Sequence, residues 1–452
     1  MKNLETDILI IGAGPAGMVA GMTAVENNPD KSVLIIKAYE KNQVPCGIPY
    51  VFGKTLGTVE KNAMLCGGGA IADMIKKVID TVESVDIENK IAKAINHTIK
   101  FDKLIFATGS VPFVHKHFEE GIKLENVFSI HKEYHKVEAL KNYLENREKV
   151  IVIGDGFIGV EMAMELQSGG KDVTIVGGRH ILGGSFDEDM AIEAEEIMVK
   201  SGIKMALGQH AKCITEKNGI ASGIELIDGT TLDAEVIILA TGYEPNTTLA
   251  KEAGLKLARY NGIWVNEFMR TKHKDIFAVG DCCGRRDFIT KEPSKVMLAS
   301  TSSAEARVAG RSLYKIKHMK DFNGTIAIFS TMIGNRVFAS AGVTEKRAIQ
   351  ENIDYITGIS KGINRHPKTI PDASKQSVKL IAMRDSGEII GGQVIGDKEA
   401  GEIVNIIGLA IESKLTLHSL ISLQIATQPL LTSAPTTYPI VMAAQIALNS
   451  TK

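Results

Sequence analysis

The sequence predicts an α/β protein, and three observations support this prediction. Short apolar runs end in glycine-rich turns that are followed by segments of helical character, as in a parallel sheet covered by helices. The chain contains 43 glycines but only 5% aromatic residues, a mixture that suits many tight strand-to-helix turns. With 452 residues, it is long enough for about three domains of roughly 150 residues each.

The composition excludes several classes of protein. Lys and Arg number 52 against 53 Asp and Glu, so the net charge of −1 is unlike the basic character of a nucleic-acid-binding protein. No apolar run reaches the roughly 18 residues that a membrane-spanning helix requires, and the first residues, MKNLETDILIIGAG, lack the pattern of a signal peptide. We therefore expect a soluble cytoplasmic protein without a nucleic-acid or membrane partner.

The cysteines indicate a reducing compartment. Five cysteines in a chain of this length do not make a disulfide framework. No group of His and Cys has the spacing of a zinc site, so we expect no bound metal. The five are Cys46, Cys66, Cys213, Cys282 and Cys283.

The N-terminal segment reads as a strand, a helix and a second strand. Residues 7–11 (DILII) form a short apolar run, a helix is expected over 15–27, and residues 32–36 (SVLII) form the next strand. This order is typical of a βαβ unit.

The same order recurs later in the chain. Residues 149–153 (KVIVI) predict a strand, 156–167 a helix and 172–176 (DVTIV) another strand. Two further apolar strands, at 104–109 (LIFATG) and 236–242 (VIILATG), end in the same signature. The chain therefore carries two copies of a nucleotide-binding layout.

Each copy has glycines in GxGxxG spacing between its first strand and its helix. Glycine permits the tight turn, the approach of the backbone to a pyrophosphate and close helix–strand packing, and the helix N-terminus favours the anion. Two such sites suggest FAD together with NADH or NADPH, because a flavin accepts a hydride from a nicotinamide. The glycines are Gly12, Gly14 and Gly17 in the first copy, and Gly154, Gly156 and Gly159 in the second.

The order of the motifs predicts the domain boundaries. We expect an FAD-binding domain made of residues 1–112 and a returning segment, 241–321, with an NAD(P)-binding domain over 113–240. Residues 322–452 carry no glycine fingerprint and read as strands (IAIFS, RVFASAG, SVKLIAMRD, EIIGGQVIG) followed by an amphipathic helix. We expect this C-terminal α+β domain to form a homodimer interface.

A third motif, AVGDC, places Gly280 and Asp281 after the apolar strand at 276–279. A carboxylate at this strand end could accept a hydrogen bond from a ribitol hydroxyl. The residues alone are equally compatible with an N-cap aspartate.

The motifs GAGPAG, ATGS, GDGFIG, ATGYEPN and FAVGDC, in this order, resemble the FAD-dependent pyridine nucleotide–disulfide oxidoreductases. GVTE at 342–345 extends the resemblance into the C-terminal part. The segment PCGIPY at 45–50 is similar to the branch of coenzyme A-disulfide reductases, polysulfide reductases and NADH oxidases. Those enzymes use one cysteine beside the flavin, and the CxxxxC pair of other members is absent here.

The resemblance implies that Cys46 is the redox centre, that Asp281 binds the ribitol of FAD, and that Glu161 lies near the nicotinamide. An inert buried cysteine and a surface helix charge stay open as alternatives for Cys46 and Glu161. A helix N-terminus could lower the pKa of the Cys46 thiol, and the other four cysteines are expected to be structural. Cofactor contacts are expected from the fingerprint glycines and from Ala16, Lys37, Thr108, Gly109, Gly177, Arg179, Gly242 and Gly280.

Two departures from the family pattern concern the nucleotides. An acid usually ends the second strand of the FAD fold, but this chain has Lys37, with Glu40 as a loose substitute. The matching place in the second copy is Gly177, which does not repel a 2′-phosphate, and Arg179 or His180 could meet that phosphate. We therefore expect that NADPH is accepted or preferred.

A third departure lies near the C-terminus. Two-cysteine relatives carry a His-Pro pair that acts across the dimer interface, whereas this chain has Gln428-Pro429. Tyr438 is the remaining candidate donor nearby, and a structural tyrosine is the alternative.

The leading hypothesis is therefore an NAD(P)H-dependent FAD enzyme that reduces a disulfide, persulfide or polysulfide, such as coenzyme A disulfide, through Cys46. The alternative is an NADH oxidase or peroxidase that reduces oxygen or peroxide while Cys46 cycles through a sulfenic acid. A third hypothesis, a flavoprotein redox sensor or electron-transfer partner, lacks the single-sign charge block that a partner surface would show.

Overall fold

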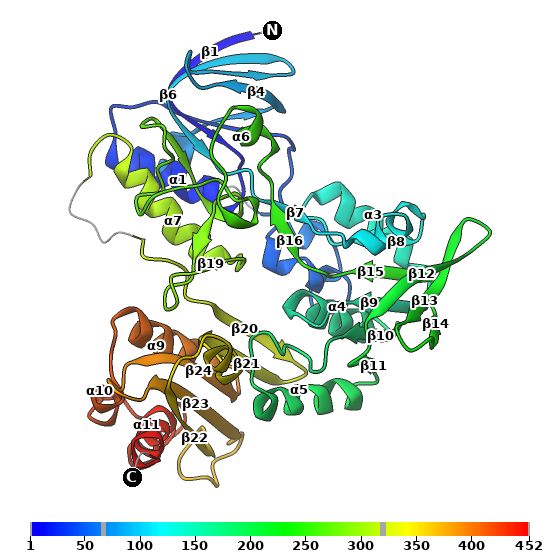
Figure 1. Ribbon diagram of the computed structural model, residues 1–452, viewed down its shortest axis with the longest axis vertical. Coiled ribbons are helices and arrows are strands. Elements are labelled where there is room, and N and C mark those ends of the chain that lie inside the picture. Colours follow the sequence, from blue (N-terminus) through cyan, green and yellow to red (C-terminus); the bar gives the residue numbers. More distant parts are fainter. Residues whose placement is uncertain (1, 65–68, 317–321, 451–452) are drawn as a thin grey trace.

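The computed structural model describes residues 2–64, 69–316 and 322–450, which form three bodies, each built on a sheet (Figure 1). Two bodies are built on parallel Rossmann-like sheets, and the third is an antiparallel sheet with helices, so the expected α/β fold with an α+β C-terminal domain is confirmed. Within these residues no helix is long and apolar enough to cross a membrane.

The first body has the N-terminal strand at the centre of its sheet. The order is β3-β2-β1-β6, with β17 parallel to the carboxyl end of β6, and with β5 and β4 continuing antiparallel. Ile8, Leu9 and Ile10 are fully buried, as the apolar run predicts. The elements are β1 (Lys2–Ile11), α1 (Pro15–Asn27), β2 (Val33–Lys37), β3 (Lys76–Ile79), β4 (Val82–Asp86), β5 (Ile91–Ala94), β6 (His97–Phe106), β17 (Ile276–Ala278) and α7 (Ala299–Ser312), which packs on α1.

The second body is a five-stranded parallel sheet in the order β11-β10-β9-β15-β8, with a small antiparallel sheet, β12-β13-β14, beside it. Its elements are β8 (Val127–Ser129), α3 (Tyr134–Leu144), β9 (Lys149–Ile153), α4 (Phe157–Ser168), β10 (Asp172–Gly177), α5 (Glu188–Lys200), β11 (Lys204–Leu207), β12 (Ala211–Lys217), β13 (Ile220–Leu226), β14 (Thr231–Asp233) and β15 (Val236–Leu239).

The chain passes between these bodies through two paired strands. β7 (Ser110–Pro112) leaves the first body and β16 (Tyr243–Pro245) returns to it, and the two pair antiparallel with Pro112 opposite Tyr243. β17 then joins the first sheet (Figure 1). The first sheet therefore contains strands that precede the second body in the sequence and one strand that follows it. Short elements along the returning segment are α6 (Thr248–Glu252), β18 (Arg285–Arg286) and β19 (Pro293–Ser294), and α2 (Ala70–Asp73) precedes β3.

The third body is an antiparallel sheet in the order β20-β21-β24-β23-β22, with helices packed against it. It lies at the end of the molecule opposite to β1 (Figure 1). Its elements are β20 (Ile328–Ile333), β21 (Arg336–Gly342), α8 (Glu345–Gln350), β22 (Tyr355–Ile363), β23 (Lys375–Met383), β24 (Ile389–Gly396), α9 (Ala400–Glu412), α10 (Leu417–Ile421) and α11 (Pro439–Asn449).

A buried ionic cluster joins the second body to the third. Lys379 of β23 has a side chain that is 1% exposed, and its Nζ lies 3.1 Å from Asp187 and 3.0 Å from Asp189, at the start of α5. Glu345 of α8 also pairs with it. Asp187 receives a further hydrogen bond of 2.6 Å from the amide of Gln393 in β24. The cluster therefore fixes the N-terminus of α5 against the antiparallel sheet.

Candidate active site

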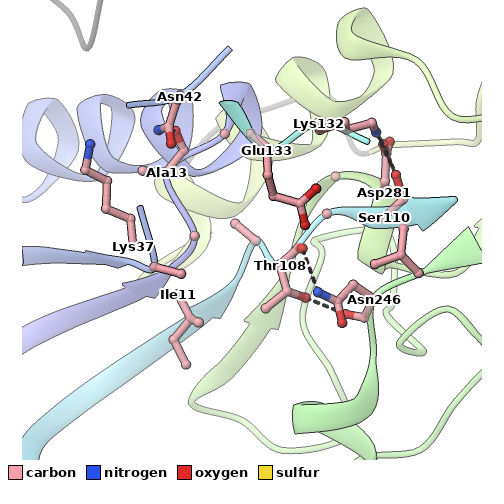
Figure 2. A pocket seen from close by; sticks show the side chains of 18 of the residues that line it. Ile11, Ala13, Lys37, Asn42, Thr108, Ser110, Lys132, Glu133, Asn246 and Asp281 are labelled. Atoms are coloured by element: carbon pink, nitrogen blue, oxygen red, sulfur yellow. Dashed lines mark hydrogen bonds and ion pairs between the residues drawn. The ribbon is translucent and has the colours of Figure 1, made fainter. Parts of the chain in front are cut away.

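A cavity of about 670 Å³ opens at the carboxyl ends of the first parallel sheet. Its walls come from the turn before α1, the end of β2, the turn after β6 and the two joining strands, and Figure 2 shows their side chains facing the cavity. The lining includes most of the residues that the sequence assigns to the flavin side: Gly12, Gly14, Ala16, Lys37, Cys46, Thr108, Gly109, Gly280 and Asp281.

The turn before α1 has the shape of an anion cradle. Gly12 has a φ of +111°, and a Cβ there would lie 2.2 Å from the carbonyl oxygen of Ala107. Gly14 precedes α1 without any side-chain cap, and a Cβ on it would meet nothing within 4 Å. Gly17 does not line the cavity; a Cβ on it would meet the Gly12 carbonyl oxygen at 2.0 Å. The free N–H groups and open space fit the pyrophosphate of FAD.

The turn before α4 repeats this geometry in the second body. Gly154 has a φ of +129°, and a Cβ on it would lie 2.3 Å from the carbonyl oxygen of Ala240. Gly156 is open like Gly14, and Gly159 is packed against Gly154 like Gly17 against Gly12. The two turns therefore have the same construction, and the second fits the pyrophosphate of a nicotinamide dinucleotide.

Asp281 is held at the cavity by hydrogen bonds from three other segments. Ser110 Oγ and Lys132 Nζ donate to its Oδ2 at 3.0 Å and 2.8 Å, and Ser302 Oγ donates to Oδ1 at 3.4 Å. Burial alone would raise the pKa of Asp281, but Lys132 and Arg285 hold it below its ordinary value. The side chain is therefore an ionised acceptor, as a contact with a hydroxyl-rich ribitol chain requires.

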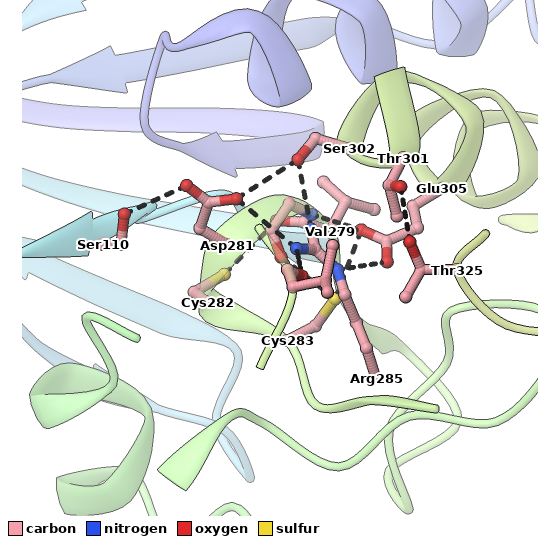
Figure 3. Close-up of polar contacts among 12 residues, drawn as sticks. Ser110, Val279, Asp281, Cys282, Cys283, Arg285, Thr301, Ser302, Glu305 and Thr325 are labelled. Carbon is pink, nitrogen blue, oxygen red and sulfur yellow. Dashed lines mark hydrogen bonds and ion pairs between the residues drawn. The ribbon is translucent and has the colours of Figure 1, made fainter. Parts of the chain in front are cut away.

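A second network lies directly behind Asp281 (Figure 3). Arg285 donates to the buried carboxylate of Glu305 at 2.8 Å, and Glu305 accepts from the backbone N–H of Gly280 at 2.8 Å. Cys282 and Cys283 are buried here, and burial raises the pKa of both thiols. Their environment is that of structural cysteines.

Cys46 lies in a single 3₁₀ turn, Pro45–Gly47, with its side chain exposed at the cavity wall. Desolvation by the surrounding walls, followed by the charge of Glu161, raises the pKa of its thiol, and Lys132 opposes the rise. The turn is too short to act as a helix N-terminus that lowers the pKa. Cys66 lies outside the described residues, and Cys213 is half-buried in β12.

Glu161 of α4 is half-buried at the junction with the third body. Thr331 of β20 donates a hydrogen bond of 2.8 Å to its Oε1. Burial raises the pKa of Glu161 to about 7, and the nearby Glu165 adds to the rise. Its negative charge in turn contributes to the raised pKa values of Cys46 and Tyr50.

An acid that the sequence analysis did not identify lies beside the turn that follows β10. Asp155, inside the second glycine turn, accepts a hydrogen bond of 2.7 Å from the N–H of Gly178. A Cβ at Gly177 would lie 2.5 Å from the Asp155 Cβ, so glycine here makes room for that side chain. Arg179 is 80% exposed, whereas His180 is bound by Glu195 at 3.0 Å. Arg179 also lies 3.6 Å from the carboxylate of Glu188.

The cavity wall at the end of β2, where the family usually has an acid, also differs from what the sequence predicts. Lys37 does line it, with its Nζ donating to the backbone oxygen of Glu40 at 2.6 Å. Glu40 is not part of the lining, but Glu83 of β4 is. The lining therefore contains a glutamate, Glu83, that no motif marked.

Other lining residues also had no motif to mark them. Asn42 donates to the Ala13 carbonyl oxygen at 2.9 Å, and Lys132 lies 4.6 Å from the ring centre of Tyr243. Glu133 has a pKa lowered to about 2, chiefly by its hydrogen bond with His131. Ser110 could have been found, because it follows the ATG signature directly.

Gly242 and Tyr438, which the sequence also assigns to the site, do not line the cavity. Gly242 lies next to Tyr243, which does, and has a φ of +99° at the start of the returning strand. Tyr438 precedes α11 in the third body, where it packs against the antiparallel core and burial raises its pKa.

Comparisons with known proteins match this architecture over nearly the whole chain. Residues 6–306 match the model of the pyridine nucleotide-disulphide oxidoreductase family, and residues 328–439 match that of its dimerisation domain. A protein of Methanocaldococcus jannaschii named NADH oxidase is 29% identical, over 93% of this chain and 94% of the relative. The NAD(P)H coenzyme A polysulfide/persulfide reductase of Pyrococcus horikoshii is 30% identical, over 87% and 88%.

Among solved structures, an NAD-dependent persulfide reductase from A. fulgidus superposes with a TM-score of 0.90 at 26% identity, over 98% of this chain and 83% of that chain. The glycine turns, the ionised Asp281 and the cavity agree with the cofactors of this family, FAD and NADH or NADPH. The chain is therefore an oxidoreductase that belongs to the pyridine nucleotide-disulphide oxidoreductase family.

Proposed function

We propose that the chain is an NAD(P)H-dependent reductase that reduces a disulfide, persulfide or polysulfide through Cys46. The observation that carries this proposal is the place of Cys46: among the cysteines that the structure describes, it alone lines the cavity. The sulfur chemistry therefore rests on a single thiol.

The residues around the cavity have different roles in this reaction. The turn at Gly14 and Asp281 hold FAD, which supplies two-electron transfer from the nicotinamide to sulfur. Lys132 pairs with the ionised Asp281, and its positive charge favours the thiolate form of Cys46. The thiolate attacks one sulfur of the acceptor, the S–S bond of the acceptor breaks, and a mixed disulfide forms while the other sulfur leaves as a thiolate.

The electron acceptor that we propose is based on the names of the relatives. The names of the P. horikoshii and A. fulgidus proteins support a persulfide or a coenzyme A-linked polysulfide. The name of the M. jannaschii relative supports the alternative, an NADH oxidase in which Cys46 cycles through a sulfenic acid.

An anaerobic titration separates these functions. The protein is reduced with one equivalent of NADH, and coenzyme A disulfide, polysulfide or oxygen is then added. We expect reoxidation of the flavin absorbance by the sulfur acceptors without oxygen. If only oxygen reoxidises the protein, the oxidase function replaces the reductase function.

We also propose that Gly177 and Arg179 let the enzyme use NADPH as well as NADH. Arg179 supports this because it is exposed beside the end of β10. We further propose a cytoplasmic homodimer in which residues 322–452 form the interface and bring Tyr438 to the partner's flavin. The match to a dimerisation domain and the free cysteines support this proposal.

A further inference from the structure

The segment that follows Cys46 packs into the core of the second body. Its side chains Ile48, Val51 and Phe52 are buried, and they share one apolar cluster with residues of α4. The apolar clusters of the first body, over the part of the chain that the structure describes, contain none of residues 45–59. In Figure 1 the blue turns of this segment lie beside α4. The position of Cys46 therefore depends on the second body.

A carboxylate in the last turn of α4 holds the end of this segment. Thr55 Oγ1 donates a hydrogen bond of 2.6 Å to Glu165 Oε1, and the N–H of Lys54 donates to Ser168 Oγ at 3.3 Å. The chain passes so close to α4 that a Cβ on Gly53 would lie 2.3 Å from the Glu165 carbonyl oxygen. We refer to the hydrogen bond between Thr55 and Glu165 as the clamp.

Glu165 is an unexpected residue at this place in a helix. It is only 9% exposed, and no Lys or Arg in the described ranges forms an ion pair with it. Its negative charge also lies near the C-terminal end of α4, where the helix dipole disfavours an anion. A buried carboxylate without a cation destabilises the fold, so its presence calls for a role. Holding the Cys46 segment is a role that its contacts support.

The other side of the Cys46 turn is fixed by Asn62, which is buried. Its Nδ2 donates to the Val44 carbonyl oxygen at 3.1 Å and to Gln43 Oε1 at 2.5 Å. Gly47 directly follows Cys46, and a Cβ on this glycine would lie 2.0 Å from Asn62 Oδ1. The turn is therefore fixed between Asn62 on one side and α4 on the other.

We propose that Thr55 and Glu165 are positioning residues that hold the Cys46 thiol at the wall of the cavity. The clamp acts through the backbone and the buried side chains between Thr55 and the Cys46 turn. This inference rests on the proposed function, in which the sulfur of Cys46 forms and resolves a mixed disulfide at the cavity.

Loss of the clamp should change two reactions of Cys46 in opposite directions. The surrounding walls desolvate the thiol and raise its pKa. A released segment is more open to water, so the thiol should react faster with a small alkylating reagent. Disulfide reduction requires the sulfur in one fixed place, so this reaction should become slower.

The first test is Thr55→Val, which keeps the branched shape of the side chain but removes the hydroxyl. We expect disulfide reduction about tenfold slower, with unchanged FAD content and rate of flavin reduction by NADH. Alkylation of Cys46 by iodoacetamide, measured by mass spectrometry, should be about tenfold faster. Thr55→Ser keeps the hydroxyl and should restore wild-type values. Thr58→Val is the matched control, because this exposed threonine accepts a hydrogen bond within its own turn.

The buried cysteines show whether the fold itself has opened. Cys282 and Cys283 are 0% and 4% exposed, so iodoacetamide reaches them only when the first body opens. They should stay unmodified in Thr55→Val. Equal acceleration at Cys46 and Cys283 would mean that the clamp only stabilises the whole fold, and would overturn the inference. Wild-type rates of disulfide reduction and Cys46 alkylation in Thr55→Val would overturn it as well.

The second test changes the other partner of the clamp. Glu165→Gln keeps an oxygen that can accept from Thr55 and should retain near wild-type rates. Glu165→Ala removes the acceptor and should behave like Thr55→Val. The double variant Thr55→Val/Glu165→Ala should be no slower than either single variant, because both remove the same contact. Additive losses would show that the two residues act separately and would refute the proposal.

The positioning role and the proposed function can fail separately. If wild-type protein reduces no disulfide, persulfide or polysulfide, the proposed function is wrong. Alkylation of Cys46 needs no acceptor, so the same variants then still decide the role of the clamp. An alkylation rate of Cys46 that is the same in wild type, Thr55→Val and Glu165→Ala overturns it.

Discussion

Cys46 is the residue on which the sulfur chemistry depends. We expect Cys46→Ser to retain FAD and to be reduced by NAD(P)H at the wild-type rate, because nicotinamide-to-flavin transfer needs no thiol. Reduction of disulfide or polysulfide should disappear, since a serine hydroxyl is far less acidic and forms no mixed disulfide. Stopped-flow absorbance separates the two half-reactions.

The buried cysteines provide the control for that experiment. Cys283→Ser should leave both half-reactions nearly intact, because this thiol contacts the Gly280 carbonyl oxygen rather than the cavity. Disulfide turnover by Cys46→Ser at the wild-type rate would instead indicate a simple flavin oxidase or diaphorase.

Glu161 gives a pH-dependent prediction. Its pKa is raised on folding from 4.5 to about 7, so the folded protein binds the proton more tightly than the unfolded chain. The charge therefore destabilises the fold increasingly as pH rises from about 5 to 8, by about 2 kcal/mol after allowing for partial exposure. Glu161→Gln should remove this penalty and raise Tm more at pH 8 than at pH 5, by calorimetry.

Glu196→Gln is the matched control, because this residue lies on the solvent side of α5 with its side chain 61% exposed. Its Tm change should be small and the same at both pH values. An equal Tm change for Glu161→Gln at both pH values would mean that Glu161 has an ordinary pKa.

At the residue scale, the sequence could mark only side chains that belong to a motif. Cys46 and Asp281 follow recognisable signatures, and both line the cavity. Lys132 lies in no motif, because it reaches Asp281 from the second body across 149 positions of the chain.

The two glycine turns are the elements that bind the dinucleotides, and they can be tested against each other. Gly14→Ala and Gly156→Ala each place a methyl group into open space, so both variants should fold. We expect Gly14→Ala to weaken FAD binding about tenfold or more, because the methyl group stands where the pyrophosphate lies. Its NAD(P)H site should be unaffected.

Gly156→Ala should show the opposite result, with normal FAD content and a KM for NAD(P)H raised about tenfold. Each variant is thus the control for the other. FAD loss in Gly156→Ala, or an unchanged KM, would show that the second turn does not bind the nicotinamide dinucleotide. FAD content is measured by absorbance, and KM by steady-state kinetics.

At the element scale, the sequence predicted α1, β2, β9, α4 and β10 to within a residue, whereas the runs 7–11 and 104–109 mark only the carboxyl ends of β1 and β6. Apolar runs such as 149–153 are buried on both faces, and the GxGxxG turns fix where the helices begin. Asp155 was missed because an acid was expected after β10, whereas the backbone turn brings one from before α4.

The ionic cluster around Lys379 governs how the bodies stay together. Lys379→Met should leave the buried Asp187 and the partly exposed Glu345 without a counter-charge, which costs about 3–5 kcal/mol. We expect a lower Tm by calorimetry and faster limited proteolysis near the start of α5. Lys361→Met, on the exposed side of β22, should leave both unchanged. A Lys379→Met protein with wild-type Tm would mean that the cluster adds no net stability.

At the scale of the molecule, the sequence indicated three bodies but not how they meet. The periodicity of residues 322–452 predicted strands and a helix, yet nothing in it showed that Lys379 would pair with the start of α5. Such contacts depend on side chains that are far apart in the chain, so local sequence patterns cannot predict them.

The joining strands have a further consequence. Because Pro112 and Tyr243 lie opposite each other in one ladder, the second body leaves and re-enters its host at neighbouring points, about 5 Å apart. Residues 113–242 are therefore a cassette, whose exchange for the matching segment of a relative breaks one short ladder and spares the first sheet, provided that the new segment keeps Lys132, Glu165 and the two aspartates that pair with Lys379. The preference for NADH or NADPH can therefore be exchanged together with this segment, while Cys46 and the rest of the first body stay unchanged.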